Sequence, residues 1–376
     1  MPSLSRFGSF CPMVYSSLCN SRILRITDGV LSVGGGRHSV RFCDVISLEN
    51  LLTAWKRFSK GKRSAPDVAR FELRLEENLF SLHERLLRGA WKNDLYTAKL
   101  IADPKPRLIH IASVRDKVFF QAVYQQLYPV FDKTFIHDSY ASRELKGTHA
   151  GVRCFEVFAR KVSANYTCPM FVLKCDIRKF FEHIGHALLF ALIARKVTDE
   201  KLLALIRVII TSFQTELGKG LPLGNVTSQL FANIYLNELD QFVEHTLKAR
   251  HYIRYCDDCV ILHRSHAVLE RHIGEIRDFL RNHLSLELHP NKVTIRKLRQ
   301  GTDFLGYVSL PHFRVLRTRT KKRMLKRLTA LSRNTHTRED FENTLPVILS
   351  YLGILSHCRG NILRQTILKL FEKWLR

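Results

Sequence analysis

The sequence HYIRYCDDCVILH at residues 251–263 sets two adjacent aspartates between two short apolar runs. This pattern predicts two strands bent tightly around a turn, with Asp257 and Asp258 at its tip. Adjacent acids alone are weak evidence of a site, because most such pairs lie in solvated turns. Here the flanking strands would carry both charges into a core, where a carboxylate without a compensating cation is costly. The stretch therefore predicts a cation site at the end of a buried hairpin.

A second apolar run, residues 170–175, predicts another buried strand, and this strand ends at Asp176. Carboxylate oxygen is the ligand that hard divalent cations prefer. Two such ions a few ångströms apart support nucleotidyl transfer, because one activates the attacking 3′ hydroxyl and the other neutralises the triphosphate. We predict Asp176, Asp257 and Asp258 as the catalytic residues and as ligands of these metal ions.

The composition predicts a globular chain with a polyanionic partner. Its 376 residues are 45% hydrophobic, which suffices for a sizeable core. Lys and Arg number 60 against 34 acids, and the net charge of +26 favours nucleic acid as the partner, either of a non-specific binding protein or of an enzyme.

The nine cysteines form no repeating framework, so we expect a reducing, cytoplasmic setting. The CxxC pair Cys256 and Cys259 has no second pair to complete a zinc site. No apolar run reaches the length of about 20 residues that spans a membrane, so no membrane association is expected.

Hydrophobic periodicity predicts the flanking elements. Ser47 is expected to cap a helix that runs to residue 58, and a second helix is expected over residues 66–89. Alternating apolar and polar residues predict a hairpin with a basic tip over residues 96–111. Further helices are predicted at residues 115–127, 199–213, 227–247 and 266–283, further strands at 286–288 and around 304–307, and a basic helical segment after Pro311.

The motifs resemble those of reverse transcriptases. Tyr255-Cys256-Asp257-Asp258 resembles the YxDD box of this family, and CDIRKFF at residues 175–181 resembles its first metal-binding motif. LPLGNVTSQ at residues 221–229 resembles the loop and helix under the incoming nucleotide. Lys292 resembles the lysine of the next motif, and Phe304-Leu305-Gly306 resembles the primer grip. These motifs follow one another in the order found in the family.

The resemblance implies an α+β right-hand polymerase fold, in which fingers and a helical thumb flank a palm with an antiparallel sheet. We expect residues 46–170 to form mainly the fingers, 171–310 mainly the palm with the nucleotide-pocket loop and primer grip, and 311–376 the basic helical thumb. Residues 1–45 are expected to be a disordered extension or to lie upstream of the true start. The implied cofactors are two Mg²⁺ ions, which Mn²⁺ can replace. The implied partners are template RNA, a DNA or RNA primer and deoxynucleoside triphosphates.

The resemblance also implies roles for single residues. Ile177 joins the three aspartates at the metal ions. The nucleotide-binding positions are Lys105, Arg107, Phe181, Leu223, Gly224, Gln229 and Lys292, and the basic run that includes Arg319, Lys321, Lys322 and Arg323 is expected to bind nucleic acid. Phe181 corresponds to the steric gate that excludes a ribose 2′ hydroxyl, with plain core packing as the alternative. Lys292 either supplies a proton to the departing pyrophosphate or balances charge.

One stretch indicates the subtype of reverse transcriptase that this chain resembles. The sequence LGNVTSQLFANIYLNELD at residues 223–240 is similar to the corresponding sequence in the enzymes of diversity-generating retroelements. Many reverse transcriptases carry Gln where this chain has Leu223. The resemblance implies frequent errors at template adenines, a small basic accessory protein as partner, and a bacterial or phage-infected cell as the setting. An enzyme of group II introns is expected to carry more sequence after the thumb. The alternatives are a reverse transcriptase of phage defence or another bacterial role, and an RNA-binding protein whose polymerase site is vestigial.

Overall fold

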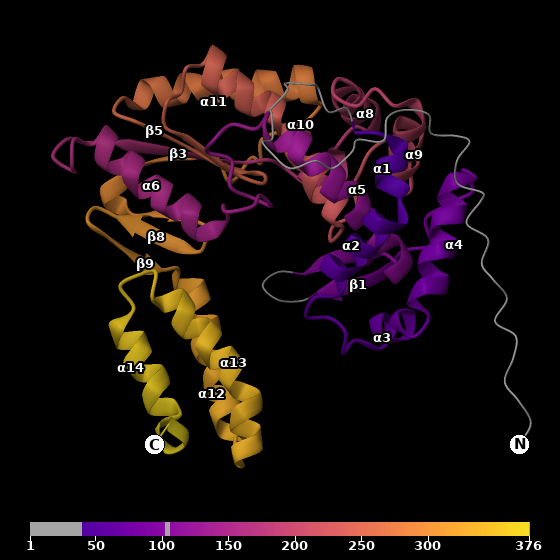
Figure 1. Cartoon of the computed structure of the whole chain (residues 1–376). Helices are drawn as coiled ribbons and strands as arrows, with labels where there is room; N and C mark the ends of the chain where they lie inside the picture. The colour runs from indigo at the N-terminus through magenta and orange to yellow at the C-terminus, as the bar shows by residue number, and fades with distance from the viewer. Residues whose placement is uncertain (1–39, 102–105, 376) are drawn as a thin grey trace, which may run out of the picture. The chain divides into compact units, whose positions relative to one another are not determined.

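The computed structural model describes residues 40–101 and 106–375, with side chains to residue 373 (Figure 1). Lys105 and most of the predicted N-terminal segment 1–45 lie outside these ranges. Helix α1 (Phe42–Ile46) crosses the end of that segment, and its Val45 and Ile46 are buried. The predicted domain boundary at residue 46 therefore cuts a helix of the core.

The predicted catalytic aspartates lie in a four-stranded antiparallel sheet or in a turn between two of its strands. Its strand order is β4 (Tyr252–Tyr255), β5 (Asp258–His263), β3 (Phe171–Asp176) and β6 (Thr294–Lys297). Successive side chains of a strand point to opposite faces. Leu173 packs in one core with α10 (Val226–Gln241) and α11 (His266–Leu284), whereas Val172 packs in a second core with α6 (Thr148–Val162). Because helices pack against both faces of the sheet, the side chains on both sides of a strand are apolar, and the strands appear in the sequence as continuous apolar runs.

The predicted fingers consist of packed helices and one hairpin. They comprise α2 (Leu48–Ser59), α3 (Pro66–Glu72), α4 (Leu75–Leu87), the strands β1 (Thr97–Ile101) and β2 (Arg107–Ile111), and α5 (Val114–Asp132). The Ser47 hydroxyl accepts the Asn50 N–H at 3.2 Å, which confirms the predicted cap of α2. The single helix predicted over residues 66–89 is wrong, because the chain breaks at the exposed Leu73. The side-chain amide of Asn78 stabilises the break by donating to the Phe71 carbonyl at 3.0 Å, beside the Arg74 N–H that donates to it at 3.4 Å.

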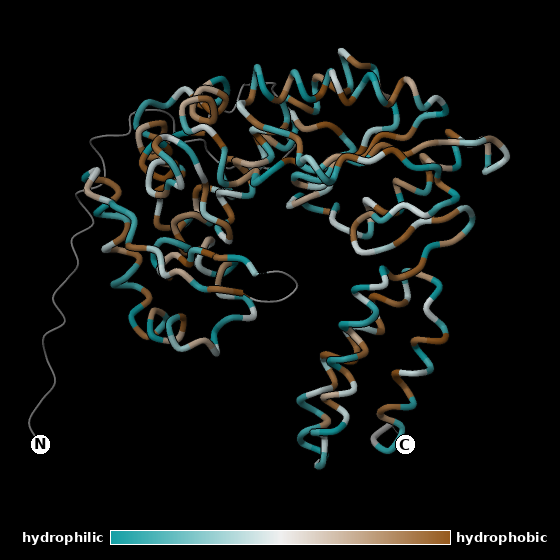
Figure 2. Tube along the Cα trace, turned by 180° about the vertical axis from the view of Figure 1, so that it is seen from behind, coloured by the Kyte–Doolittle hydropathy of each residue, from teal (hydrophilic) through white to brown (hydrophobic). Residues whose placement is uncertain are grey.

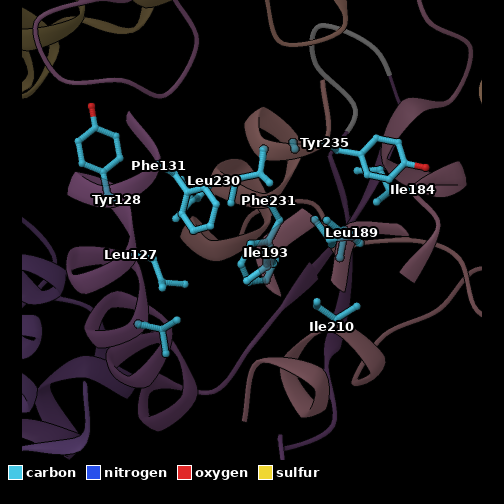
Figure 3. Close-up of a cluster of buried hydrophobic side chains, with 14 of the residues drawn as sticks. Leu127, Tyr128, Phe131, Ile184, Leu189, Ile193, Ile210, Leu230, Phe231 and Tyr235 are labelled. Atoms are coloured by element: carbon cyan, nitrogen blue, oxygen red, sulfur yellow. The ribbon is translucent and has the colours of Figure 1, made fainter. Parts of the chain in front are cut away.

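Helix α10 runs through the core beside α5 and α8 (His186–Ala194), and Figure 3 shows the side chains that meet there. They include Leu127 of α5, Ile193 of α8 and Phe231 of α10. Ile210 of α9 (Glu200–Thr211) joins them, and Asp199 caps α9 by accepting a first-turn N–H at 2.9 Å. A helix that is apolar on most of its sides has to be buried. The helix predicted over residues 227–247 ends at Gln241 and continues as a π-helical turn over Phe242–Thr246.

The chain after β6 forms a small sheet and a helical thumb. The sheet contains β7 (Thr302–Phe304), β8 (Tyr307–Leu310) and β9 (Phe313–Leu316), and the helices are α12 (Thr318–Asn334), α13 (Arg338–Leu355), α14 (Asn361–Leu370) and α15 (Glu372–Leu375). The strand predicted around residues 304–307 is instead a hairpin turn, because Leu305 and Gly306 have φ of +52° and +90°. The helix predicted directly after Pro311 begins only at Thr318, because β9 intervenes. Figure 2 shows apolar and polar residues alternating along these helices, whose apolar side chains form their own core.

The segment after α11 runs beside the end of β3 without joining the sheet. Leu288 forms an isolated bridge with Ile177, so the strand predicted at residues 286–288 is wrong. The Arg178 N–H donates to the Glu287 carbonyl at 2.8 Å, and the His289 N–H donates to the Asp176 carbonyl at 2.7 Å. These bonds hold the chain that leads to Lys292 next to the last residue of β3.

The mixture of helices and antiparallel sheets confirms the predicted α+β class of a right-hand polymerase. In the part of the chain that the structure describes, no helix has the length and apolar character needed to cross a membrane.

Candidate active site

Asp176 and Asp258 lie directly opposite each other in the antiparallel pair of β3 and β5. Side chains at opposed positions of such a pair point to the same face of the sheet. Asp257 lies at the turn between β4 and β5, and its main-chain carbonyl accepts the Ile177 N–H at 3.2 Å. The turn is tight, since Cys256 has a φ of +55°. The strand register and this hydrogen bond bring the three predicted catalytic carboxylates to one end of the sheet.

Burial raises the pKa of Asp257 and of Asp258 above the usual range of an aspartate. For Asp257 the second cause is the charge of Asp176, which raises the pKa further. For Asp258 the nearby Lys174 ammonium opposes the rise in pKa. Carboxylates in this setting ionise more readily when a cation compensates their charge. The donor set fits a hard divalent cation, since it consists of carboxylate oxygens and, from Ile177, only a main-chain carbonyl.

Two lysines pair with these carboxylates. Lys292 Nζ lies 2.8 Å from Oδ1 and 2.9 Å from Oδ2 of Asp176, and Lys174 Nζ lies 3.5 Å from Oδ1 of Asp258. Within the described ranges, no three acidic, histidine or cysteine side chains stand close enough together to enclose a metal ion. At this end of the sheet, Lys292 engages both oxygens of Asp176. A metal ion bound by Asp176 would therefore compete with an existing ion pair.

A pocket of about 760 Å³ opens beside the carboxylates. Seven of the predicted site residues line it: Arg107, Phe181, Leu223, Asp257, Asp258, Leu305 and Gly306. Other lining residues, which the motifs did not indicate, are His110, Phe213, Thr215 and Arg317. Asp176, Gly224, Gln229 and Lys292 are not among the described residues that line it. The volume is typical of small-molecule sites, which span about 300 to 1,000 Å³.

Phe180 and Phe181 are neighbours in α7 (Phe180–His183) but have different surroundings. The Phe180 side chain borders the pocket but is only 2% exposed and packs in the core near Tyr235. The Phe181 side chain is half-buried and lines the pocket. Its main-chain carbonyl accepts the Leu221 N–H at 2.8 Å, which ties it to the nucleotide-pocket loop. This geometry favours a pocket role for Phe181 over plain core packing.

The β1–β2 hairpin reaches the pocket through the exposed Arg107 and through His110. The His110 ring lies 4.5 Å from the ring of Phe213, which follows α9. The Asn225 side-chain amide donates to the Tyr96 hydroxyl at 3.2 Å. These contacts anchor the hairpin to the loop before α10. The sequence motifs did not include Tyr96 and Phe213. The signal in the sequence that could have indicated these two residues is that both side chains are aromatic.

Two glycines shape the loop that carries Leu223. Gly220 and Gly224 have φ of +106° and +113°, a region that L side chains rarely adopt. A Cβ on Gly220 would lie 2.6 Å from Thr215 Oγ1, so a side chain has no space there. Leu223 is half-buried between these glycines and lines the pocket. It presents an apolar side chain where many reverse transcriptases have an amide.

The predicted primer grip divides between the core and the pocket. Phe304 is 1% exposed, with its ring 5.9 Å from that of Phe155, so its side chain does not face the pocket. Leu305 and Gly306 do line the pocket. Arg317 lines it too, forms an ion pair with Asp303, and its N–H donates to the Gly306 carbonyl at 3.0 Å. On α12, Arg319, Lys321 and Lys322 are exposed and Arg323 is half-buried.

Comparisons of the sequence with known proteins identify one family. A family described as "Reverse transcriptase (RNA-dependent DNA polymerase)" matches residues 97–309. Protein YkfC of Escherichia coli (strain K12) is 25% identical over 278 residues, which cover 63% of this chain and 72% of YkfC. Group II intron-encoded protein LtrA of Lactococcus lactis subsp. cremoris is 24% identical over 287 residues, which cover 58% of this chain and 46% of LtrA.

Among solved structures, telomerase from Candida albicans in complex with a TWJ fragment of telomeric RNA matches with a TM-score of 0.45 and 10% identity. That match covers 74% of this chain and 61% of the telomerase chain. The family match over residues 97–309 takes in more than half of the 376 residues and includes all three aspartates. The chain therefore belongs to the reverse transcriptase (RNA-dependent DNA polymerase) family.

Proposed function

We propose that this chain copies an RNA template into DNA by nucleotidyl transfer at the end of the β3–β5 pair. The observation that carries the proposal is the strand register that sets Asp176 opposite Asp258, beside a pocket of a size suited to a nucleotide. Membership of the RNA-dependent DNA polymerase family supports the same reaction.

Asp176, Asp257 and Asp258, together with the Ile177 carbonyl, are proposed to hold two Mg²⁺ ions, which Mn²⁺ can replace. When bound, such ions activate the primer 3′ hydroxyl and neutralise the triphosphate. The protein contributes the strand register that gathers the carboxylates and the lysine that offsets their charge. Because Lys292 contacts Asp176 and does not line the pocket, its proposed role is charge balance ahead of proton donation.

The remaining pocket residues are proposed to select and orient deoxynucleoside triphosphates. Arg107 lies at the pocket as a cation for the triphosphate, and Lys105 is proposed to assist it. The Phe181 ring is proposed to exclude a ribose 2′ hydroxyl. Leu305 and Gly306 are proposed to contact the primer, because they line the same pocket from the hairpin after β7. The exposed basic face of α12 is proposed to bind the template and primer backbone.

We infer further that the chain serves a diversity-generating retroelement and makes errors at template adenines. The support is Leu223, which lines the pocket without a hydrogen-bonding group. A small basic accessory protein is the proposed partner. This chain and the accessory protein would both be positively charged and would repel each other. A nucleic acid bound by both proteins would have to offset this repulsion.

The similarity to LtrA favours a second candidate, in which the chain serves a group II intron. The two candidates predict different products. A retroelement enzyme makes cDNA with errors concentrated at adenines, whereas an intron enzyme copies its RNA without this bias. Sequencing of cDNA made on one defined RNA distinguishes them.

The general proposal is tested by primer extension on an RNA template with deoxynucleotides and Mg²⁺. Asp257→Asn and Asp258→Asn are expected to remove nearly all extension while leaving RNA binding intact, because the fold and the basic surface remain. Asp278→Asn on α11 is the matched control, since it makes the same charge change at an exposed site outside the pocket. Full extension by either active-site variant would contradict the assignment.

A further inference from the structure

Arg254 of β4 and Asp240 of α10 form a buried ion pair next to the catalytic turn. Their side chains are 1% and 0% exposed. Arg254 Nε lies 2.7 Å from Oδ1 of Asp240, and Nη2 lies 2.6 Å from Oδ2. The Tyr252 hydroxyl donates to the same carboxylate at 2.9 Å. A buried ion pair is weak evidence of net stabilisation, because two charges have to leave water. A role in positioning explains its presence better.

The third nitrogen of Arg254 reaches the turn itself. Nη1 donates to Asn233 Oδ1 at 3.1 Å and to the Cys256 carbonyl at 3.2 Å. That carbonyl belongs to the peptide that leads into Asp257. Because the φ of Cys256 is +55°, this peptide has an orientation that L residues rarely adopt without support. One guanidinium group therefore links α10 to the peptide before a metal-binding carboxylate.

The main chain around Arg254 is fixed as well. Its N–H donates to the Asp138 carbonyl at 3.0 Å, and its carbonyl accepts the Tyr140 N–H at 2.9 Å. The Asn233 amide donates to the Ala141 carbonyl at 2.9 Å. Both β4 and α10 are thus bonded to residues 138–141, and Arg254 bridges two elements that are already held in register.

We propose that Arg254 is a positioning residue for nucleotidyl transfer. Anchored by Asp240, it holds the Cys256 carbonyl and so sets the direction of the Asp257 carboxylate. Arginine suits this task because its planar group donates from three nitrogens in a fixed geometry. Lysine has one nitrogen and cannot span the carboxylate and the turn in the same way. This inference rests on the proposed function, since it assigns Arg254 a place within that reaction.

The test compares three variants of the full chain with the parent. Arg254→Lys keeps a charge opposite Asp240 but loses the three-way contact. Combining Arg254→Met with Asp240→Leu removes both buried charges together, an exchange that is often neutral or stabilising in buried ion pairs. This double variant keeps the test valid if Arg254→Lys does not fold. Tyr252→Phe is the matched control, because it removes one hydrogen bond to Asp240 without touching the turn.

The double variant is expected to retain cooperative thermal unfolding and yet to lower kcat by roughly tenfold or more, with KM for nucleotide and for primer–template changed by less than about threefold. Arg254→Lys is expected to lower kcat in the same way. Both are also expected to weaken Mn²⁺ binding by roughly threefold or more in a spectroscopic titration without substrate. Tyr252→Phe is expected to keep the parent kcat and Mn²⁺ affinity even if its melting temperature falls.

Parent-like kcat and Mn²⁺ affinity in the folded double variant would overturn the inference. Equal losses in Tyr252→Phe would also overturn it, because they would show a general effect of the buried cluster. A parent chain that fails to extend a primer would instead overturn the proposed function. The Mn²⁺ titration needs no turnover, so it separates these two failures.

Discussion

Lys292 Nζ lies 2.8 Å and 2.9 Å from the two carboxylate oxygens of Asp176. The two residues are 116 positions apart, and the His289 N–H bond to the Asp176 carbonyl brings them together. The ammonium therefore occupies the oxygens that the proposed metal ion would need.

Lys292→Met is expected to tighten Mn²⁺ binding, because the ammonium that competes for the Asp176 oxygens is removed. It is also expected to lower kcat, because the positive charge that balances the carboxylates is removed with it. The Lys292 side chain is 42% exposed. The affinity gain is expected to be about fivefold or less, since an exposed ion pair contributes at most about 1 kcal/mol. Lys297→Met, at an exposed position of β6, is the control and should leave the affinity unchanged. Equal Mn²⁺ affinity in the parent and Lys292→Met, measured by titration, would show that Lys292 does not compete.

Asp257→Asn is expected to stabilise the metal-free protein at neutral pH. Burial and the charge of Asp176 raise the pKa of Asp257 in the folded protein above its unfolded value. The protonated form therefore stabilises the fold at low pH, and this contribution is lost as the pH rises through the raised pKa. The variant, which is always neutral, should melt higher than the parent at neutral pH and equally below the ordinary aspartate value of 3.8.

Thermal unfolding in the presence of a chelator, from acidic to neutral pH, measures this difference. Asp278→Asn serves again as the control, since its carboxylate is exposed on α11. Adding Mg²⁺ should stabilise the parent more than Asp257→Asn. A melting difference that is the same at every pH would contradict the electrostatic explanation.

Phe181→Ala is expected to admit ribonucleotides while keeping DNA synthesis, because a methyl group leaves room for the 2′ hydroxyl. Loss of a steric contact worth about 1.4 kcal/mol lowers the preference for deoxynucleotides over ribonucleotides roughly tenfold. Single-nucleotide incorporation with matched ribo- and deoxynucleotides measures the ratio. Phe231→Leu should lower stability without changing that ratio, because Phe231 is buried in the core and does not line the pocket. If Phe181→Ala rejects ribonucleotides as strongly as the parent does, the Phe181 ring only fills space and does not select the sugar.

Replacing Lys321, Lys322 and Arg323 by Gln is expected to weaken binding to primer–template and to flatten its salt dependence. Each lost phosphate contact lowers the slope of log affinity against log salt by about 0.7 to 0.9, so a total change of about two is expected. Equilibrium binding at several salt concentrations measures it. A matched triple change of exposed arginines on α11, at Arg271, Arg277 and Arg281, should have a smaller effect. Equal slopes in both triple variants would mean that α12 does not face the nucleic acid.

Leu223→Gln is expected to lower misincorporation opposite template adenine more than opposite other bases. The new amide would restore a hydrogen-bonding group in the pocket, and one differential contact of about 1.4 kcal/mol changes selectivity roughly tenfold. Arg107→Ala is expected to alter the same error pattern, since Arg107 lines the same pocket. Sequencing of cDNA made on a defined RNA measures both effects.

Leu217→Gln is the control for this change, because Leu217 is 93% exposed and does not line the pocket. An accurate parent enzyme, or adenine errors unaffected by both pocket substitutions, would remove the retroelement proposal. The family assignment would stand, because it rests on residues 97–309.

The sequence by itself determined many of the local elements and singled out the candidate catalytic carboxylates. The cap at Ser47, the hairpin over residues 96–111 and the strands around Asp257 follow from patterns that span only a few residues. Local breaks were harder to predict. The turn at Leu305 and Gly306 and the break at Leu73 interrupt apolar patterns that continue in the sequence, because the fold needs the chain to change direction there.

The tertiary structure alone decided which side chains meet. The pairing of Asp176 with Asp258 depends on strand register, and the contacts of Lys292 with Asp176 and of Arg254 with Asp240 depend on the packing of separate elements. Phe180 and Phe181 are identical residues in one motif and both border the pocket, but the packing buries Phe180 and leaves Phe181 half-buried. Such choices depend on the free energy of burying many distant groups together, and no short stretch of sequence contains that information.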